Sequence, residues 1–235
     1  MSDRVVVVTG ANRGIGREVA RQLAAAGDTV ILTARDPAKA NAAAKDLARA
    51  GPSHGELVAH QLDVTDPNSA RELARFLEGR WQRLEVLVNN AAIHYDTFEQ
   101  ASTADLTVVR EALETNLLGA WQVTLALLPL MRASRRGRIV NVSSEAGSLN
   151  TMGAGAPAYR ASKAALNALT RMLAAELARD RILVNSVCPG WVATDMGGAG
   201  GRPVADGAAS VIWAVDLPDD GPTGGFFRDG RAVAW

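Results

Sequence analysis

Two patterns of hydrophobic and polar positions alternate along the chain. Short unbroken apolar runs, such as Val5–Val8, are typical of strands buried on both faces. Longer segments, such as 15–26, place apolar residues three and four positions apart, which is the spacing of one helix face. Strands that alternate with helices predict a parallel sheet with helices on both of its sides.

This reading predicts seven strands, in the spatial order 3-2-1-4-5-6-7 that is typical of a doubly wound, Rossmann-like α/β fold. We expect the strands at residues 5–8, 29–33, 56–62, 84–88, 138–142, 182–187 and 225–228. The helices are expected at 15–26, 37–50, 68–79, 104–132, from Pro157 onward, and at 205–215. A chain of 235 residues with this alternation most simply forms one domain over 1–235.

The composition narrows the class of protein. Lys plus Arg and Asp plus Glu number 25 each, so no global charge attracts nucleic acid or an anionic membrane. The single cysteine, Cys188, excludes an internal disulfide and is interpreted as a small buried residue rather than a metal ligand. We expect a cytoplasmic protein, because we find no leader-like segment and no apolar run long enough to span a membrane. We also expect no bound metal.

A glycine-rich turn, Thr9–Gly16, separates the first strand from the first helix. Gly10, Gly14 and Gly16 let the backbone turn sharply and let a ligand approach it closely. The N-terminus of the following helix then offers free N–H groups to a pyrophosphate. The alternative is a tight turn that binds nothing.

The tip of the second strand carries Arg35, followed by Asp36. A guanidinium at this position suits the 2′-phosphate of an adenosine ribose, and Arg13 supplies a second cation on the same side. Both arginines could instead be solvated surface residues. Asp63, at the tip of the third strand, either binds the adenine amine or caps the helix before Pro67.

Later strand tips and helices carry further candidates. Asn90 and Ala91 follow a strand and suit a backbone that passes close to a ribose or nicotinamide. Asn116 interrupts an apolar helix face, where its side chain either satisfies a backbone carbonyl or holds a water. Tyr159 and Lys163 lie four positions apart on one helix face, so the ammonium is expected to make the phenol easier to ionise.

The chain contains, in this order, the motifs Thr9-Gly10-x-x-x-Gly14-x-Gly16, Asn89-Asn90-Ala91, Asn116, Ser144, Tyr159-x-x-x-Lys163 and Pro189-Gly190. Together these motifs resemble the short-chain dehydrogenase/reductases over essentially the whole chain. The stretches 32–36, 61–63, 138–144 and 188–196 and the ending 221–235 are most similar to the carbonyl reductases of that family.

The resemblance implies an NADP(H)-dependent reductase of a small ketone, aldehyde or quinone. Tyr159 would protonate the carbonyl oxygen, and Lys163 would lower the Tyr159 pKa and bind the nicotinamide ribose. Ser144 rather than Ser143 would stabilise the developing alkoxide. Asn116 would anchor a water. The implied cofactor-binding residues are Gly10, Asn12, Arg13, Gly14, Ile15, Gly16, Arg35, Asp63, Val64, Asn90, Ala91, Tyr159, Lys163, Pro189, Gly190, Val192 and Thr194. An NAD-dependent alcohol dehydrogenase and a non-catalytic NADP-binding redox sensor are the alternatives.

Two departures from the family pattern bear on these expectations. Ala92 replaces the usual glycine after Asn-Asn-Ala, so it is expected to adopt a glycine-like backbone conformation. The segment between Ser144 and Tyr159 lacks the long insertion of animal carbonyl reductases, which leaves the pocket and a helix surface open. The pocket wall is expected to comprise His94, Tyr95, 149–156, Trp191 and 197–201.

The uncovered helices predict a homodimer or homotetramer. Their apolar residues point in more than one direction, which is typical of a helix that is buried on all sides. The expected contact residues are Leu118, Trp121, Leu125, Ala164, Ala168 and Leu169.

Overall fold

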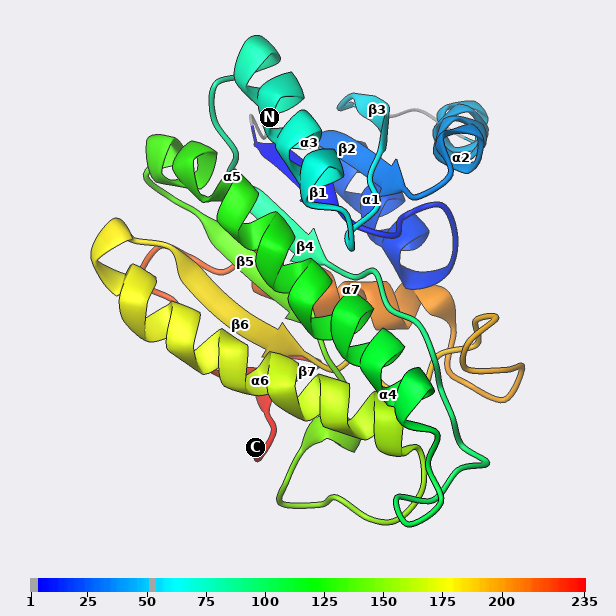
Figure 1. Cartoon of the computed structure of the whole chain (residues 1–235). Helices are drawn as coiled ribbons and strands as arrows, with labels where there is room; N and C mark the ends of the chain where they lie inside the picture. The colour runs from blue at the N-terminus through cyan, green and yellow to red at the C-terminus, as the bar shows by residue number, and fades with distance from the viewer. Residues whose placement is uncertain (1–3, 51–53) are drawn as a thin grey trace.

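An eight-stranded sheet lies at the centre of the computed structural model, which describes residues 4–50 and 54–235 (Figure 1). The strands are β1 (Val5–Val8), β2 (Thr29–Ala34), β3 (Leu57–Gln61), β4 (Val86–Asn89), β5 (Arg138–Val142), β6 (Leu183–Val187), β7 (Phe226–Arg228) and β8 (Arg231–Ala232). Their order is β3-β2-β1-β4-β5-β6-β7-β8. The predicted order of the first seven strands is therefore confirmed. The sequence missed only β8, a two-residue strand that pairs antiparallel with β7.

Helices cover both faces of this sheet (Figure 1). They are α1 (Gly14–Ala25), α2 (Pro37–Arg49), α3 (Pro67–Arg80), α4 (Leu106–Leu113), α5 (Ala120–Ser134), α6 (Pro157–Leu177) and α7 (Val204–Val215). In β1, Val6 and Val8 pack in the cluster that contains α1, α2 and α7, while Val5 and Val7 pack in the cluster that contains α3, α5 and α6. Helices on both faces explain why β1 is apolar at every position.

The long helix expected at 104–132 is interrupted in the structure. A π-helical segment, η1 (Glu114–Gly119), separates α4 from α5 and carries the buried Asn116. At its end the backbone lies close to the loop after β3, because a Cβ at Gly119 would come within 2.8 Å of a methyl carbon of Val64. The wider π turn is a bulge that hydrophobic spacing alone does not reveal.

One helical stretch among the described residues, Leu106–Ser134, is long and apolar enough to cross a membrane by length and composition. Its side chains Val123, Leu127 and Met131 are buried against the sheet together with residues of α3 and α6. This packing is typical of the core helix of a folded domain.

The parallel strands end at one edge of the sheet, where the arrowheads in Figure 1 point. Loops that follow β1, β2, β3, β4, β5 and β6 therefore gather at this edge, as expected for the ligand-binding edge of a doubly wound sheet.

Candidate active site

A cavity of about 480 Å³ opens at the carboxyl edge of the sheet. Of the residues expected at the site from sequence, those that line this cavity are Gly10, Asn12, Arg13, Gly14, Ile15, Arg35, Asp63, Val64, Asn90, Ala91, Tyr159, Lys163, Pro189 and Thr194. The expected residues outside the lining are Gly16, Asn116, Ser144, Gly190 and Val192. Lining residues that the sequence did not single out include Thr65, Ile93, Thr115, Asp195 and Met196.

The glycine turn is held in place by the amide of Asn90. Its Nδ2 donates to the carbonyl oxygens of Thr9 at 2.8 Å and Gly10 at 3.1 Å. Gly10 has a φ of +62°, and a Cβ there would lie 2.9 Å from the Cα of Ala91. A Cβ at Gly16 would overlap the Asn90 amide itself. Gly16 thus shapes the cavity indirectly, by leaving room for the side chain that fixes its wall.

The N-terminus of α1 points its free backbone groups at the cavity. Its N-cap residue, Arg13, is extended and makes no capping hydrogen bond with its side chain. The first residues of the helix, Gly14 and Ile15, line the cavity. Uncapped N–H groups and the positive end of the helix dipole make this a suitable position for a phosphate.

The charges near the tip of β2 differ from the expectation in one respect. Arg35 is exposed, lines the cavity, and has no carboxylate partner among the ion pairs of the described residues. Arg13, by contrast, forms an ion pair with Asp195 in the loop after β6. Arg13 lines the same cavity as Arg35, so its contact with a 2′-phosphate stays a prediction, and Asp195 would compete with the phosphate for its guanidinium.

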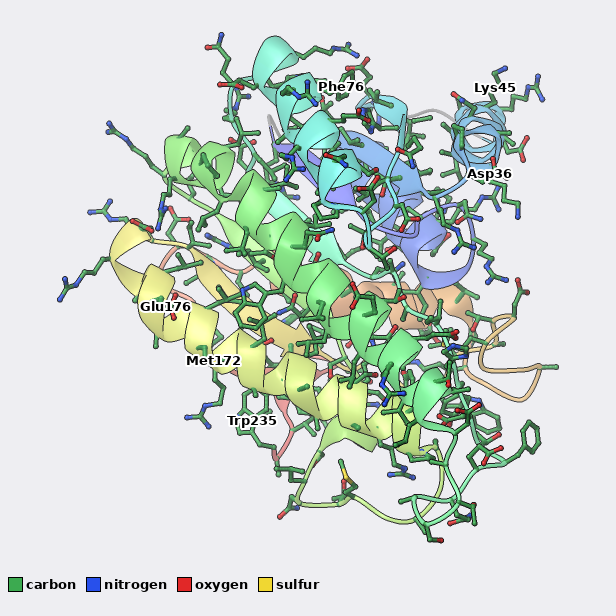
Figure 2. All side chains as sticks on the ribbon, viewed as in Figure 1. Asp36, Lys45, Phe76, Met172, Glu176 and Trp235 are labelled. Carbon is green, nitrogen blue, oxygen red and sulfur yellow. The ribbon has the colours of Figure 1, made fainter. Side chains whose placement is uncertain are left out.

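The carboxylates of Asp36 and Asp63 both accept hydrogen bonds from residues that lie close to them in the sequence. Asp36 caps α2, accepting a hydrogen bond from the backbone N of Ala38 at 2.8 Å, and Figure 2 shows it at the start of that helix. Asp63 accepts from the backbone N and the hydroxyl of Thr65, at 3.0 and 2.8 Å. The expectation that Asp63 might cap the next helix is wrong, because Asp66 caps α3. Contact of Asp63 with an adenine remains a prediction.

The two serines after β5 have different surroundings. Ser143 is buried and donates a hydrogen bond to Oδ1 of Asn167 at 2.6 Å, so its hydroxyl is used within the protein. Ser144 begins a short 3₁₀ turn, Glu145–Gly147, and its hydroxyl hydrogen-bonds the Tyr159 phenol. Ser144 is thus the serine that lies beside the tyrosine.

Tyr159 and Lys163 lie on the same face of α6, with Nζ of Lys163 5.6 Å from the centre of the Tyr159 ring. Nζ donates to the carbonyl oxygen of Val142 at 2.7 Å. Burial raises the pKa of Tyr159 to about 12 and lowers the pKa of Lys163 to about 8. The expectation of a lowered Tyr159 pKa is wrong for this structure, because burial raises the pKa and outweighs the opposite effect of the hydrogen bond with Ser144. The phenol therefore keeps its proton near neutral pH.

Asn116 uses its side chain to join three segments. Its Oδ1 accepts from the backbone N of Ile93 at 2.8 Å, and its Nδ2 donates to the Ile93 carbonyl and to the Ser162 hydroxyl, each at 3.0 Å. These contacts match the alternative in which Asn116 satisfies backbone groups. An anchored water stays a prediction.

The loop after β4 holds features that the sequence did not reveal. The carboxylate of Asp96 accepts hydrogen bonds from the backbone N–H groups of Ala158 and Tyr159 at the start of α6. Ala92 does not adopt the glycine-like conformation expected of it, whereas His94 does, with a φ of +56°. His94 also has a partner that was not foreseen, since its Nε2 lies 2.8 Å from Oε2 of Glu111.

The expected substrate wall lies beside the cavity rather than in its lining. The Tyr95 ring meets the Tyr159 ring edge-on, with centroids 5.0 Å apart. Trp191 is exposed and donates from Nε1 to the carbonyl of Gly197 at 2.7 Å. Cys188 is buried, as expected of a small apolar residue.

The sequence matches the family model described as short chain dehydrogenase over residues 4–202. The chain belongs to the short-chain dehydrogenase/reductase family. Among family members, carbonyl reductase [NADPH] 1 of Sus scrofa is 36% identical, with 99% of this chain and 94% of the relative covered. That alignment runs over 281 positions, although this chain has 235 residues, so the relative contains segments that this chain lacks.

Two further similarities support the same family. Salutaridine reductase of Papaver bracteatum is 33% identical, with 95% of this chain and 94% of the relative covered. The solved structure of an NADPH-bound carbonyl reductase from chicken fatty liver superposes with a TM-score of 0.87 at 31% identity, and each chain is covered completely. The chain is thus an oxidoreductase of the short-chain dehydrogenase/reductase type, similar to carbonyl reductases.

Proposed function

We propose that the protein reduces the carbonyl group of a small ketone, aldehyde or quinone with NADPH. The observation that carries this proposal is the cavity that extends from Arg35 and the uncapped start of α1 to a protonated Tyr159 beside Ser144 and Lys163. The names of the similar carbonyl reductases, which specify NADPH, support the same cofactor.

The residues present fit NADPH at both ends of the cavity. Arg35 is a cation without a carboxylate partner among the described ion pairs, which suits a 2′-phosphate, and the N–H groups at Gly14 and Ile15 suit the pyrophosphate. Asp36, the acidic group that could favour NADH, is held at the α2 N-terminus. These features favour NADPH over the NAD-dependent alternative.

In the proposed reaction NADPH supplies a hydride to the carbonyl carbon. Tyr159 donates its phenol proton to the carbonyl oxygen, which its raised pKa allows because the phenol is still protonated at neutral pH. Ser144 donates a hydrogen bond to the same oxygen while negative charge develops there. The Lys163 ammonium lies close enough to stabilise that charge and to bind the neighbouring ribose.

The test is NADPH oxidation, followed by absorbance, with a panel of carbonyl compounds. Tyr159→Phe keeps the ring and removes the proton, so turnover should fall by about 10²-fold or more, the scale of general acid catalysis. NADPH binding, measured by fluorescence titration, should be retained in this variant. Turnover by the wild type also excludes the alternative of a non-catalytic redox sensor, and near-normal turnover by Tyr159→Phe would contradict the proposed role of the phenol.

A further inference from the structure

The start of α6, the helix that carries Tyr159, lacks a cap of its own. Its N-cap residue is Ala156, which has a left-handed backbone with a φ of +49° and no side-chain acceptor. Pro157 occupies the first helical position. The N–H groups of the first turn therefore need an acceptor from elsewhere in the chain.

Asp96, some sixty residues earlier in the sequence, provides this acceptor. Its Oδ2 accepts from the backbone N of Ala158 at 2.9 Å, and its Oδ1 accepts from the backbone N of Tyr159 at 3.1 Å. Both carboxylate oxygens are thus used, and one of them binds the peptide unit of the proposed general acid itself. A negative charge at a helix N-terminus is also favoured by the helix dipole.

The same short segment is fixed at its other end. Asn116 holds the backbone N and carbonyl of Ile93, and it also hydrogen-bonds Ser162. The Ser162 hydroxyl in turn donates to the carbonyl of Tyr159 at 2.8 Å. The peptide groups on both sides of the Tyr159 Cα are therefore connected to the segment 93–96.

Between these two anchors the segment places one aromatic ring against another. Tyr95 packs edge-on against Tyr159, with 5.0 Å between the ring centroids, and Tyr159 is the inner ring of the pair. His94 takes the left-handed conformation that turns the chain between Ile93 and Tyr95. Backbone and ring of Tyr159 are thus restrained by one segment.

We infer that Asp96 is a positioning residue, which holds the Tyr159 phenol in line with the carbonyl oxygen of the substrate. This role rests on the proposed function, in which Tyr159 is the proton donor. A displacement of about 1 Å in a reacting group can lower a rate by as much as 10²-fold. Loss of the Asp96 carboxylate should therefore reduce turnover even if the helix still forms.

The matched control is Asp105, which lies at the other end of the same loop. Asp105 caps α4 by accepting from the backbone N of Thr107 at 2.7 Å, so Asp105→Ala also removes a carboxylate cap. Asp96→Ala should lower kcat about tenfold or more, while the KM for NADPH stays within about twofold of the wild type. Asp96→Asn retains one acceptor oxygen and should give an intermediate kcat. Asp105→Ala should keep kcat within about twofold.

A second measurement does not depend on turnover. Amide hydrogen exchange in the cofactor-free protein should become faster at Ala158 and Tyr159 in both Asp96 variants and should stay unchanged there in Asp105→Ala. An active wild type whose Asp96→Ala variant keeps its kcat, or equal losses in Asp96→Ala and Asp105→Ala, would overturn the role of Asp96 alone. A wild type without NADPH-dependent turnover on the whole panel would overturn the proposed function instead.

Discussion

At the residue scale, burial determines the protonation of the two groups proposed for catalysis. Tyr159 keeps its proton because its phenolate would be poorly solvated, and the same burial makes the Lys163 ammonium easier to deprotonate. Carbonyl reduction needs an acid that is protonated at the start of the reaction. A Tyr159 phenol that is protonated at neutral pH is the form that the proposed reduction requires.

These pKa values predict how the reaction depends on pH. With the pKa of Lys163 at about 8 and that of Tyr159 at about 12, the first group to lose its proton as pH rises is the lysine. We expect kcat/KM for reduction to be constant below about pH 7.5 and to fall above about pH 8, because the positive charge beside the reacting oxygen disappears. A profile that stays flat to pH 10 would contradict this assignment.

Arg35 is expected to determine the choice of cofactor. One charge-assisted contact with a phosphate contributes about 1.5 to 3 kcal/mol, or roughly 10- to 100-fold in affinity. Arg35→Asp removes this contact and adds a repulsive carboxylate, so kcat/KM for NADPH should fall by at least that factor while NADH use rises. The matched control is Arg75→Asp on α3, an exposed arginine outside the cavity lining. Equal use of both cofactors by the wild type would refute the assignment.

At the element scale, the site depends on how closely a few backbones approach one another. The start of α1 lies against the end of β4, and the π-helical turn of η1 lets Asn116 reach the loop after β4. Each approach depends on a residue that is small or has an amide side chain. Substitutions of the glycines at these approaches should therefore change the site without removing any proposed catalytic group.

Gly16 provides a direct test of this dependence. In Gly16→Ala the new methyl group would displace the Asn90 amide from its bonds to Thr9 and Gly10, so we expect a loss of about 1 to 3 kcal/mol in unfolding free energy and weaker NADPH binding. Gly79→Ala in α3 is the control, because no atom lies within 4 Å of the added Cβ. That variant should gain up to about 1 kcal/mol from helix propensity. Denaturant unfolding of both variants compares the two effects, and equal stabilities would contradict the proposed role of Gly16.

At the scale of the whole molecule, the outer surface of η1, α5 and α6 remains partly apolar. Leu118, Leu125 and Met172 are 44%, 57% and 48% exposed, and Figure 2 shows Met172 on the outer side of α6, near Glu176. Leu169, which the sequence assigned to this surface, is instead buried in the core of the same chain. Because Leu118 and Leu125 are exposed, association into a homodimer or homotetramer stays a prediction.

Light scattering at micromolar concentration tests this association. The wild type should have the mass of a dimer or tetramer, and Leu125→Glu should yield smaller particles, because a buried unpaired charge opposes the contact. Phe98→Glu is the control, since Phe98 is 94% exposed on the loop between β4 and α4 and is not among the expected contact residues. A monomeric wild type would contradict the prediction.

Hydrophobic periodicity and the order of short motifs determined the fold and most of the cavity lining. The central strands β1, β2, β4, β5 and β6 were predicted because a strand that is buried on both faces is rich in apolar residues, as in Val5–Val8. The glycine turn, Arg35 and the pair Tyr159 and Lys163 were predicted because the residues that make up each motif are close together or regularly spaced in the sequence.

Tertiary structure alone decided the features that depend on residues far apart in the chain. Asp96 meets Ala158 and Tyr159, and Arg13 meets Asp195, at separations over which sequence spacing carries no information. The raised pKa of Tyr159 likewise depends on the protein atoms that surround the ring. Periodicity reports which face of an element is buried, whereas hydrogen-bond partners and proton affinities depend on what the folded chain packs against that face.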